Sequence, residues 1–331
     1  MMTGTVGTSA TVAKAVRLAA VRATRAPSVH NTQPWRLVIR STSLEVHADP
    51  SRRLQVLDPR GRQMLISIGC AVFNARVALA AAGVGAELQW QPDPARPDFI
   101  ARLGVTTDGA ELRLAHLEPA IELRQTNRRS FTDENVPDEL VHRLISAAAA
   151  EGAQLFPIVR PEHRLATARL SQLADRYENA DPAYRTELRM WTTDDPRRAD
   201  GVPAFAIPHV DGTGRDDLPL RDFDTRGMGW LPADSRSSSD QCLLLLGTRT
   251  DDEPAWLRAG CALERVLLEV ALAGYTASPL TQVIEVAPTH ERLRNELGLS
   301  MEPHVLLRVG RAPMTPSTRR RRLVDVLSEA E

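Results

Sequence analysis

The sequence is poor in cysteine, and its cysteines form no pattern. The 331 residues include only Cys70, Cys242 and Cys261, an odd number without a C-x-x-C pair. A disulfide framework and a structural zinc site are therefore not expected. The histidines likewise show no metal-ligand spacing, and we predict no metal. Unpaired thiols are typical of a reducing compartment, so the composition favours a cytoplasmic location.

Long apolar runs and an excess of charge are also absent. No stretch approaches about 18 uninterrupted apolar residues, and no apolar block precedes a cleavage site near residue 20, so we expect neither a transmembrane helix nor a signal peptide. The formal net charge of -1 gives no steering toward nucleic acid or a membrane surface. Aromatic residues make up only 4% of the chain, whereas 43% are hydrophobic and 25% are charged. These proportions are typical of a globular protein that buries a substantial core.

Apolar periodicity predicts a mixture of helices and strands, the α+β class. Two long and mostly buried helices are predicted over 63–83 and 256–274, the first closed by Gly83. Shorter helices are predicted over 12–23, 137–150 and 163–177. The predicted strands are 36–39, 44–48, 86–91, 99–105, 242–247, 283–286 and 304–309.

The two long predicted helices resemble each other in sequence. Gly69-Cys70-Ala71 in the first is repeated 191 positions later in the second, as Gly-Cys-Ala at 260–262. At the same offset Gly83 matches Gly274, and two alanines also match. This pattern favours a duplicated unit with halves 1–120 and 121–331, packed as two subunits pack. We expect such a covalent pseudo-dimer to be monomeric in solution.

The segment 181–240 interrupts the second half. It is rich in Pro, Gly, Asp and Arg and poor in periodic apolar positions. A long segment of this kind within a compact domain is usually functional or mobile, and we interpret it as a lid-like insertion.

The most distinctive motif is the stretch 26–35, Ala-Pro-Ser-Val-His-Asn-Thr-Gln-Pro-Trp, between a predicted helix and a predicted strand. Ser28 and Asn31 are able to donate to a phosphate or ribityl oxygen, and Pro27 and Pro34 hold the backbone extended. From the residues alone, a helix end and turn without any ligand is an equally good interpretation.

This stretch resembles the A-P-S-x-x-N-x-Q-P-W signature of the FMN-dependent nitroreductase superfamily. The segment 124–131 is similar to that family's Arg-x-Ser-x-Arg-x-Phe motif, and 316–323 is similar to its closing Pro-Arg-Arg-Pro-Leu segment. The resemblance covers 15–326 except the insertion. The layout is closest to the mycobacterial Acg-type, dormancy-associated nitroreductase-like proteins, in which the family's usual homodimer is fused into one polypeptide.

The sequence also departs from the family pattern. Thr126 replaces a serine, and one extra residue precedes Phe131, which leaves open whether Arg128 or the next arginine points inward. Val29 and His30 stand where small hydroxyl residues are usual, and position 322 has arginine in place of proline.

The resemblance implies an α+β nitroreductase-like fold with one FMN per chain. In the family's dimers, one subunit provides the arginine motif and its partner provides the Ser/Asn loop. Here the first half has only the loop and the second half has only the arginine motif, with 151–155 in the place of a second loop. The residues implied in FMN binding are Pro27, Ser28, Val29, Asn31, Gln33, Arg124, Thr126, Arg128, Ser278, Pro279, Leu280, Arg319, Arg320 and Arg321.

Three functions follow as hypotheses. In the first, NAD(P)H reduces FMN at N5, beside the loop 278–280, and a nitro compound or quinone then accepts the electrons, so that no side chain is required as catalytic acid or base. In the second, the insertion covers the isoalloxazine with Trp191, Phe205, Phe223 and Trp230, and the protein stores FMN. In the third, the flavin site is vestigial and the chain is an interaction module. The arginines 319–322 are compatible with a phosphate grip, a nucleic-acid patch or a solvated turn, but the net charge makes nucleic acid the least favoured partner.

Overall fold

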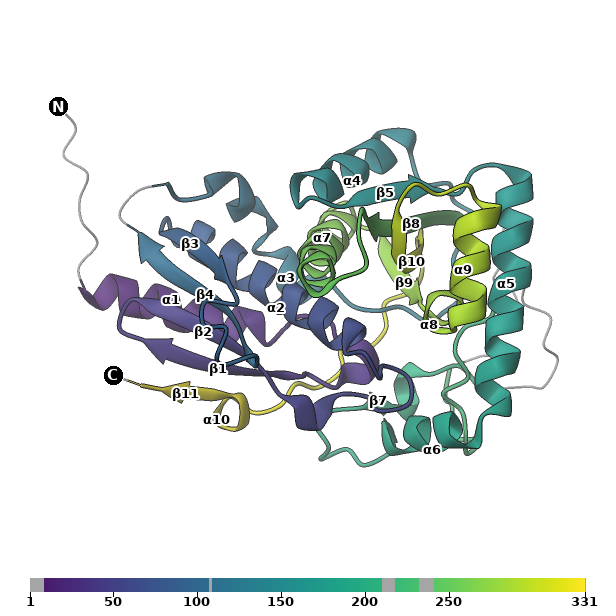
Figure 1. Cartoon of the computed structure of the whole chain (residues 1–331), viewed down its shortest axis with the longest axis horizontal. Helices are drawn as coiled ribbons and strands as arrows, with labels where there is room; N and C mark the ends of the chain where they lie inside the picture. Colours follow the sequence, from purple (N-terminus) through teal and green to yellow (C-terminus); the bar gives the residue numbers. More distant parts are fainter. Residues whose placement is uncertain (1–8, 107–108, 210–217, 232–240, 331) are drawn as a thin grey trace.

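A computed structural model describes residues 9–106, 109–209, 218–231 and 241–330 of the chain. Two long helices, α2 (Arg62–Ala81) and α7 (Glu253–Leu272), pack against each other at the centre (Figure 1). By length and composition α2 is apolar enough to cross a membrane, but 83% of its apolar window is buried inside the protein, as in a core helix.

The α2–α7 crossing explains the repeated Gly-Cys-Ala motif. A Cβ atom added to Gly69 would lie 2.3 Å from the Leu257 carbonyl oxygen, and one added to Gly260 would lie 2.1 Å from that of Ile66. The thiol of Cys70 donates to the Gly260 carbonyl at 3.1 Å, and that of Cys261 donates to the Gly69 carbonyl at 3.4 Å. Each copy of the motif therefore makes the same contact with the other copy.

Two sheets lie on either side of this helix pair (Figure 1), one mixed and one antiparallel. One sheet has the order β11-β1-β2-β4-β3 and the other β5-β8-β10-β9. The first comprises β1 (Trp35–Arg40), β2 (Ser43–Ala48), β3 (Gly85–Trp90), β4 (Phe99–Thr106) and β11 (Leu327–Glu329). The second comprises β5 (Gln154–Pro157), β8 (Cys242–Thr248), β9 (Thr276–Leu280) and β10 (Glu302–Gly310).

The last strand of the chain belongs to the sheet of the first half. β11 pairs in parallel with β1, with Leu37 opposite Leu327. It follows α10 (Leu323–Val326), and the extended segment before α10 passes beneath the first half. The C-terminal segment thus crosses from the second sheet to the first.

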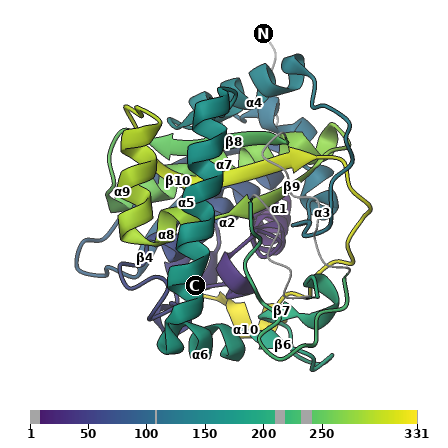
Figure 2. The same cartoon turned by 90° about the vertical axis from the view of Figure 1, so that its right-hand side faces the viewer.

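The remaining helices pack around the central helix pair, the two sheets and one another. They are α1 (Ser9–Ala23), α3 (Ala120–Leu123), α4 (Asp138–Ala150), α5 (Pro161–Ala180), α6 (Pro182–Met190), α8 (Gln282–Glu285) and α9 (Ala287–Glu296). Two short strands, β6 (Thr192–Thr193) and β7 (Val202–Pro203), pair with each other. Helix α5 packs on α8 and α9 along one side of the molecule (Figure 2).

The structure corrects two predicted elements. The predicted strand 283–286 lies mostly in the helix α8, and residues 278–280, predicted as a loop, lie in the strand β9. Both predicted long helices, the predicted α+β class and the other predicted strands are confirmed, with shifts of a few residues at their ends.

The chain between β5 and β8 is longer than the predicted insertion, because it also contains α5. It is attached to the first half through α6. The Glu187 carboxylate accepts hydrogen bonds from three successive backbone N–H groups, those of Gln55, Val56 and Leu57. The parts 210–217 and 232–240 lie outside the described residues.

Candidate cofactor site

The Ser/Asn motif forms a tight loop between α1 and β1. His30, Asn31 and Gln33 have left-handed backbone angles, with φ of 48°, 55° and 51°. The Ser28 hydroxyl accepts from the Gln33 backbone N–H at 2.9 Å and thereby closes the turn. Three left-handed non-glycine residues in one turn are costly, and such conformations gather at functional sites.

One side of this loop faces an apolar chamber of about 840 Å³. Its walls come from the loop, α2, α7, the segment after α3, strands β9 and β10, α8 and the insertion. The lining includes Pro27, Ser28, Val29, His30, Thr126, Arg128, Leu220, Arg221, Phe223, Ser278, Pro279 and Leu280.

The other side of the loop faces a polar chamber of about 950 Å³. Pro27, Ser28, Thr126 and Arg128 line both chambers, so the two chambers are adjacent; together they are called the cleft, with an apolar end and a polar end. The polar end adds Arg25, Asn31, Arg124, Gln125, Thr318 and Arg320, together with residues of the 315–317 segment.

Three arginines converge at the polar end. The Arg320 guanidinium donates to Asn31 Oδ1 at 3.1 Å and to the Arg25 carbonyl at 3.2 Å, and Arg124 donates to the same carbonyl at 3.3 Å. The Nε atoms of Arg124 and Arg320 are buried and have no hydrogen-bond partner among the described residues. Burial, followed by repulsion from Arg124 and Arg25, lowers the pKa of Arg320 to about 9. Arginine keeps its proton in proteins, so burial and repulsion make the charged Arg320 side chain energetically unfavourable. A bound anion would relieve that cost.

A buried carboxylate lies behind this cluster. Glu264 Oε1 is 3.6 Å from Arg124 Nε, and its side chain is fully buried on α7. Burial raises the pKa of Glu264 to about 7, and the nearby Arg124 opposes that rise. Arg25 pairs with Glu122 at 3.2 Å. Arg320 has no carboxylate within ion-pair distance among the described residues, so it is the least compensated of the three cations.

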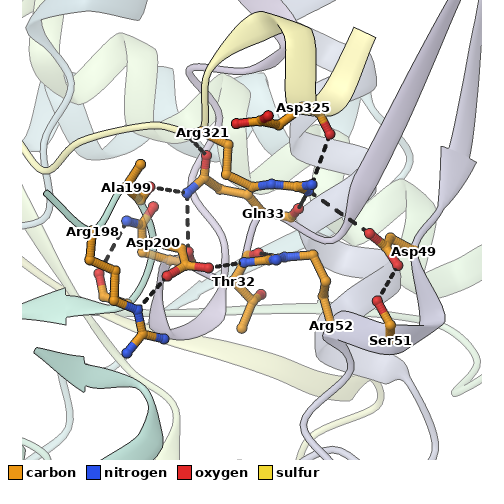
Figure 3. A network of polar contacts seen from close by, with 12 residues as sticks. Thr32, Gln33, Asp49, Ser51, Arg52, Arg198, Ala199, Asp200, Arg321 and Asp325 are labelled. Carbon is orange, nitrogen blue, oxygen red and sulfur yellow. Dashed lines mark hydrogen bonds and ion pairs between the residues drawn. The ribbon is translucent and has the colours of Figure 1, made fainter. Parts of the chain in front are cut away.

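Gln33 and Arg321 belong to a different network, which ties the loop to the insertion and to the C-terminal segment (Figure 3). The Gln33 side chain donates to the Ala199 carbonyl at 2.8 Å and accepts from the Arg321 backbone N–H at 2.7 Å. Arg52 and Arg198 both pair with Asp200.

The structure therefore brings together most of the predicted site residues. Gln33 and Arg321 do not line either chamber, and Arg319 is exposed and lines a separate hollow beside the insertion. Of the two candidate arginines in the second motif, Arg128 lines the cleft. The next residue, Arg129, uses its backbone N–H to donate to Asn127 Oδ1.

The insertion contributes to the apolar chamber through Leu220, Arg221 and Phe223. Of the four aromatic residues predicted to cover the site, only Phe223 lines this chamber. Trp191 packs beside Arg52, while Phe205 and Trp230 line the separate hollow. Arg25, His30 and Arg221 are not among the site residues predicted from the sequence. For Arg25 and His30, the only signal in the sequence is their position, next to the 26–35 motif and within it, respectively.

Arg221 is held in place by contacts with several residues. It pairs with Glu285, lies 3.7 Å from Glu178, and its Nη1 is 2.6 Å from His30 Nε2. Phe223 contacts the His30 ring edge-on at 5.2 Å between centroids, and the Arg128 guanidinium lies 4.9 Å from the centre of the Phe223 ring. The described residues contain no group of three or more His, Cys, Asp or Glu side chains that would hold a metal ion.

No protein-family model matches the sequence. Among curated proteins, one from Mycobacterium tuberculosis H37Rv named as an NAD(P)H nitroreductase, Rv3131, is 36% identical over 96% of this chain and 92% of its own. The protein named as the NAD(P)H nitroreductase acg from the same strain is 29% identical, over 98% and 97% of the two chains. Another, described as uncharacterized, is 32% identical over 89% and 86%.

Solved structures are more distant. A nitroreductase with bound FMN from Desulfitobacterium hafniense DCB-2 is 12% identical, covers 64% of this chain and 98% of its own, and has a TM-score of 0.41. A BluB-like flavoprotein from Clostridium difficile 630 is 16% identical, covers 67% and 100%, and has a TM-score of 0.43.

Proposed function

This chain belongs to the nitroreductase family of its mycobacterial relatives, and we propose that it binds one FMN in the two-ended cleft and transfers electrons from NAD(P)H to small acceptor molecules. The observation that carries the proposal is the junction of an apolar chamber with a polar chamber where three arginines converge. FMN has the matching polarity, since it joins a flat aromatic ring to a phosphate.

The residues present fit the cofactor. Arg25, Arg124 and Arg320 would hold the phosphate, because charge-assisted hydrogen bonds to arginine are among the strongest in proteins. Arg320 supports this assignment, because it has no carboxylate within ion-pair distance among the described residues. Ser28 and Thr126, at the junction of the chambers, would contact the ribityl chain.

The apolar chamber would receive the isoalloxazine ring. Pro27 and Val29 line it on the side of the loop, and Ser278, Pro279 and Leu280 line it on the side of β9. FMN, when bound, would supply hydride transfer from the nicotinamide to the acceptor. The chain's own residues orient the ring and exclude water, and none of them is required to exchange a proton with it.

We infer a single site per chain from the unequal links in the two halves. In the first half, 24–34 connect α1 to β1, whereas in the second half only 151–153 connect α4 to β5. The Glu151 side chain in the short link is only 6% exposed and pairs with Arg76 at 2.6 Å and Arg265 at 2.8 Å. This arrangement supports a pseudo-dimer of halves 1–120 and 121–331, which we propose is a cytoplasmic monomer.

The first experiment is a visible spectrum of the purified protein, with the FMN released on denaturation measured per chain. Anaerobic NADH or NADPH is then added, followed by 1,4-benzoquinone or nitrobenzene. About one FMN per chain that bleaches with NAD(P)H and recovers with an acceptor is the expected result. A colourless protein that cannot be loaded with FMN would refute the proposal and favour the interaction-module hypothesis.

Storage of FMN is the second candidate function, and the position of the insertion favours it. Leu220, Arg221 and Phe223 line the apolar chamber, so the insertion occupies space next to the ring. If it closes the site, the bound flavin will not bleach with NAD(P)H, and Phe223→Ala will restore bleaching. Phe205→Ala is the matched control, because Phe205 belongs to the insertion but lines the separate hollow.

A further inference from the structure

Glu264 places a carboxylate in the middle of the central helix α7, out of contact with water. Its side chain is fully buried, and neither of its oxygens has a hydrogen-bond partner of normal geometry among the described residues. Arg124 Nε, 3.6 Å from Oε1, belongs to its only ion-pair partner among them. A carboxylate without water or hydrogen-bond donors is costly, so the ionised form of Glu264 depends on the charge of Arg124.

Arg124 faces the cofactor site as well as Glu264. Its side chain lines the polar chamber, where its Nη2 donates to the Arg25 carbonyl at 3.3 Å. Under the proposed function, the same guanidinium holds the FMN phosphate. One cation would then lie between two anions, the buried carboxylate and the phosphate. Two anions that share one cation repel each other, and they do so more strongly in a buried site than in water.

The groups that act on Glu264 come from three segments. Arg124 follows α3, Arg320 belongs to the C-terminal segment, and Cys70 and Asn74 lie on α2. Burial raises the pKa of Glu264 to about 7, while Arg124, then the Asn74 amide, then Arg320 oppose the rise. Within the described residues, α4 and the strands β8, β9 and β10, which also pack on α7, add no charge that changes this pKa. Cys70 stays a neutral thiol, because burial raises its pKa well above the usual value.

We propose that Glu264 and the FMN phosphate compete for Arg124, so that Glu264 takes up a proton from the solvent when FMN binds. Glu264 is a positioning residue in this scheme, since it acts on the phosphate through Arg124. Once neutral, it leaves the whole charge of Arg124 to the phosphate. The inference rests on the proposed function and adds to it a control of cofactor affinity by pH.

The sign of the effect follows from the proton count. The bound phosphate raises the pKa of Glu264 further, so the complex holds more protons than the free protein, and FMN affinity falls as pH rises. The second pKa of a phosphate monoester is about 6, so FMN itself changes little between pH 7 and 9. We expect the Kd for FMN to increase about fivefold or more over that range.

Riboflavin and two variants isolate the contribution of Glu264. Riboflavin lacks the phosphate, so its Kd should change less than about twofold between pH 7 and 9. Glu264→Gln removes the titrating group and keeps its shape, so its Kd for FMN should also stay within about twofold. Glu122→Gln is the matched control. Glu122 faces the same cluster through Arg25 at 3.2 Å, but its side chain is 45% exposed to water, and this variant should keep the pH dependence of the wild type.

Proton uptake is counted directly by isothermal titration calorimetry of the wild-type apoprotein at pH 7.5, in buffers of different ionisation enthalpy. We expect uptake of about half a proton or more with FMN and almost none with riboflavin. This count needs no variant, so it decides the question even where Glu264→Gln does not fold.

The outcomes separate the inference from the proposed function. No proton uptake with FMN, equal uptake with riboflavin, or an unchanged pH dependence in Glu264→Gln would overturn the inference and leave FMN binding in place. A wild-type protein that cannot be loaded with FMN at any pH would refute the proposed function, and the inference with it.

Discussion

Removing the Arg320 side chain is the sharpest test of the phosphate site. Arg320 is the member of the arginine cluster without a carboxylate partner at ion-pair distance among the described residues. Its Nη atoms already contact Asn31 and the Arg25 carbonyl, which orients the group toward the polar chamber. We therefore expect Arg320→Ala to weaken FMN binding mainly through the lost charge.

The size of the effect follows from the kind of contact. A hydrogen bond to a charged group contributes about 1.5–3 kcal/mol, which corresponds to about a tenfold to hundredfold increase in Kd. The assay is a titration of apoprotein with FMN, followed by flavin fluorescence. Riboflavin is titrated in parallel, because it has the same ring and ribityl chain without the phosphate.

The arginine run itself provides the control. Arg319 is the neighbouring residue, is exposed and does not line the cleft, so Arg319→Ala removes the same charge from the surface. We expect that variant to bind FMN within about twofold of the wild type, since long-range attraction is screened by salt. The reasoning is refuted if Arg319→Ala weakens FMN as much as Arg320→Ala does, or if Arg320→Ala weakens riboflavin and FMN equally.

Three further outcomes test the fold around the cleft. Gly260→Ala should lower the free energy of unfolding by about 3 kcal/mol or more, measured with heat or denaturant, because its Cβ would lie 2.1 Å from a carbonyl oxygen of α2. Gly104→Ala is the control and should change the free energy of unfolding little, since no atom lies within 4 Å of its Cβ. Burial raises the pKa of Glu264 from 4.5 to about 7 in the folded protein, so the stability that this group contributes is present below pH 4.5 and lost as pH rises to 7. The unfolding free energy of the wild type should therefore fall by about 3 kcal/mol over that window, relative to that of Glu264→Gln. A difference between the two proteins that does not change with pH would contradict the assignment. Asp200→Ala removes the carboxylate between two arginines (Figure 3) and should cost about 1–2 kcal/mol; limited proteolysis should then cut the insertion faster, and unchanged cutting would show that this network does not hold it.

The fold could be predicted where local pattern and burial agree. The helix predicted over 63–83 has apolar residues on every face, and in the structure α2 is buried in the core along most of its length. The predicted strand at 283–286 was wrong because a short apolar run does not distinguish a strand from a buried helical turn. Packing of α8 against α5 decides that case, and α5 lies more than 100 residues earlier in the chain.

The loop at 278–280, implied by the family resemblance, was wrong. Ser278 and Pro279 both pair with β10 in the structure. The strand β9 is at the edge of its sheet, so Pro279 needs to offer no N–H to a further strand. A sequence alone does not tell which strand will be at an edge.

The candidate site could be predicted only in part, and for a physical reason. Ser28, Asn31 and Arg124 belong to compact motifs, whose resemblance to the nitroreductase signature implies a ligand. Arg221 reaches the chamber from an insertion without periodicity, and it is held there by partners from distant segments. Gln33 shows the opposite case, since a motif residue is used in the network that binds the insertion.

We propose that the predicted duplication and the proposed single site share one geometric cause. At the helix crossing, Gly69 faces Gly260 directly, and a larger side chain on either would collide with the backbone of the other helix. Neither copy can change alone, so the repeat persists there as recognisable sequence. The two links that lead into the sheets do not touch each other in this way. One is an eleven-residue loop at 24–34 beside the cleft, and the other is only 151–153, with Glu151 held in ion pairs. Under the proposed duplication, a chain that carries both halves would need only one loop and one arginine motif to complete a site, so sequence similarity would be kept at the helix crossing and lost in the links.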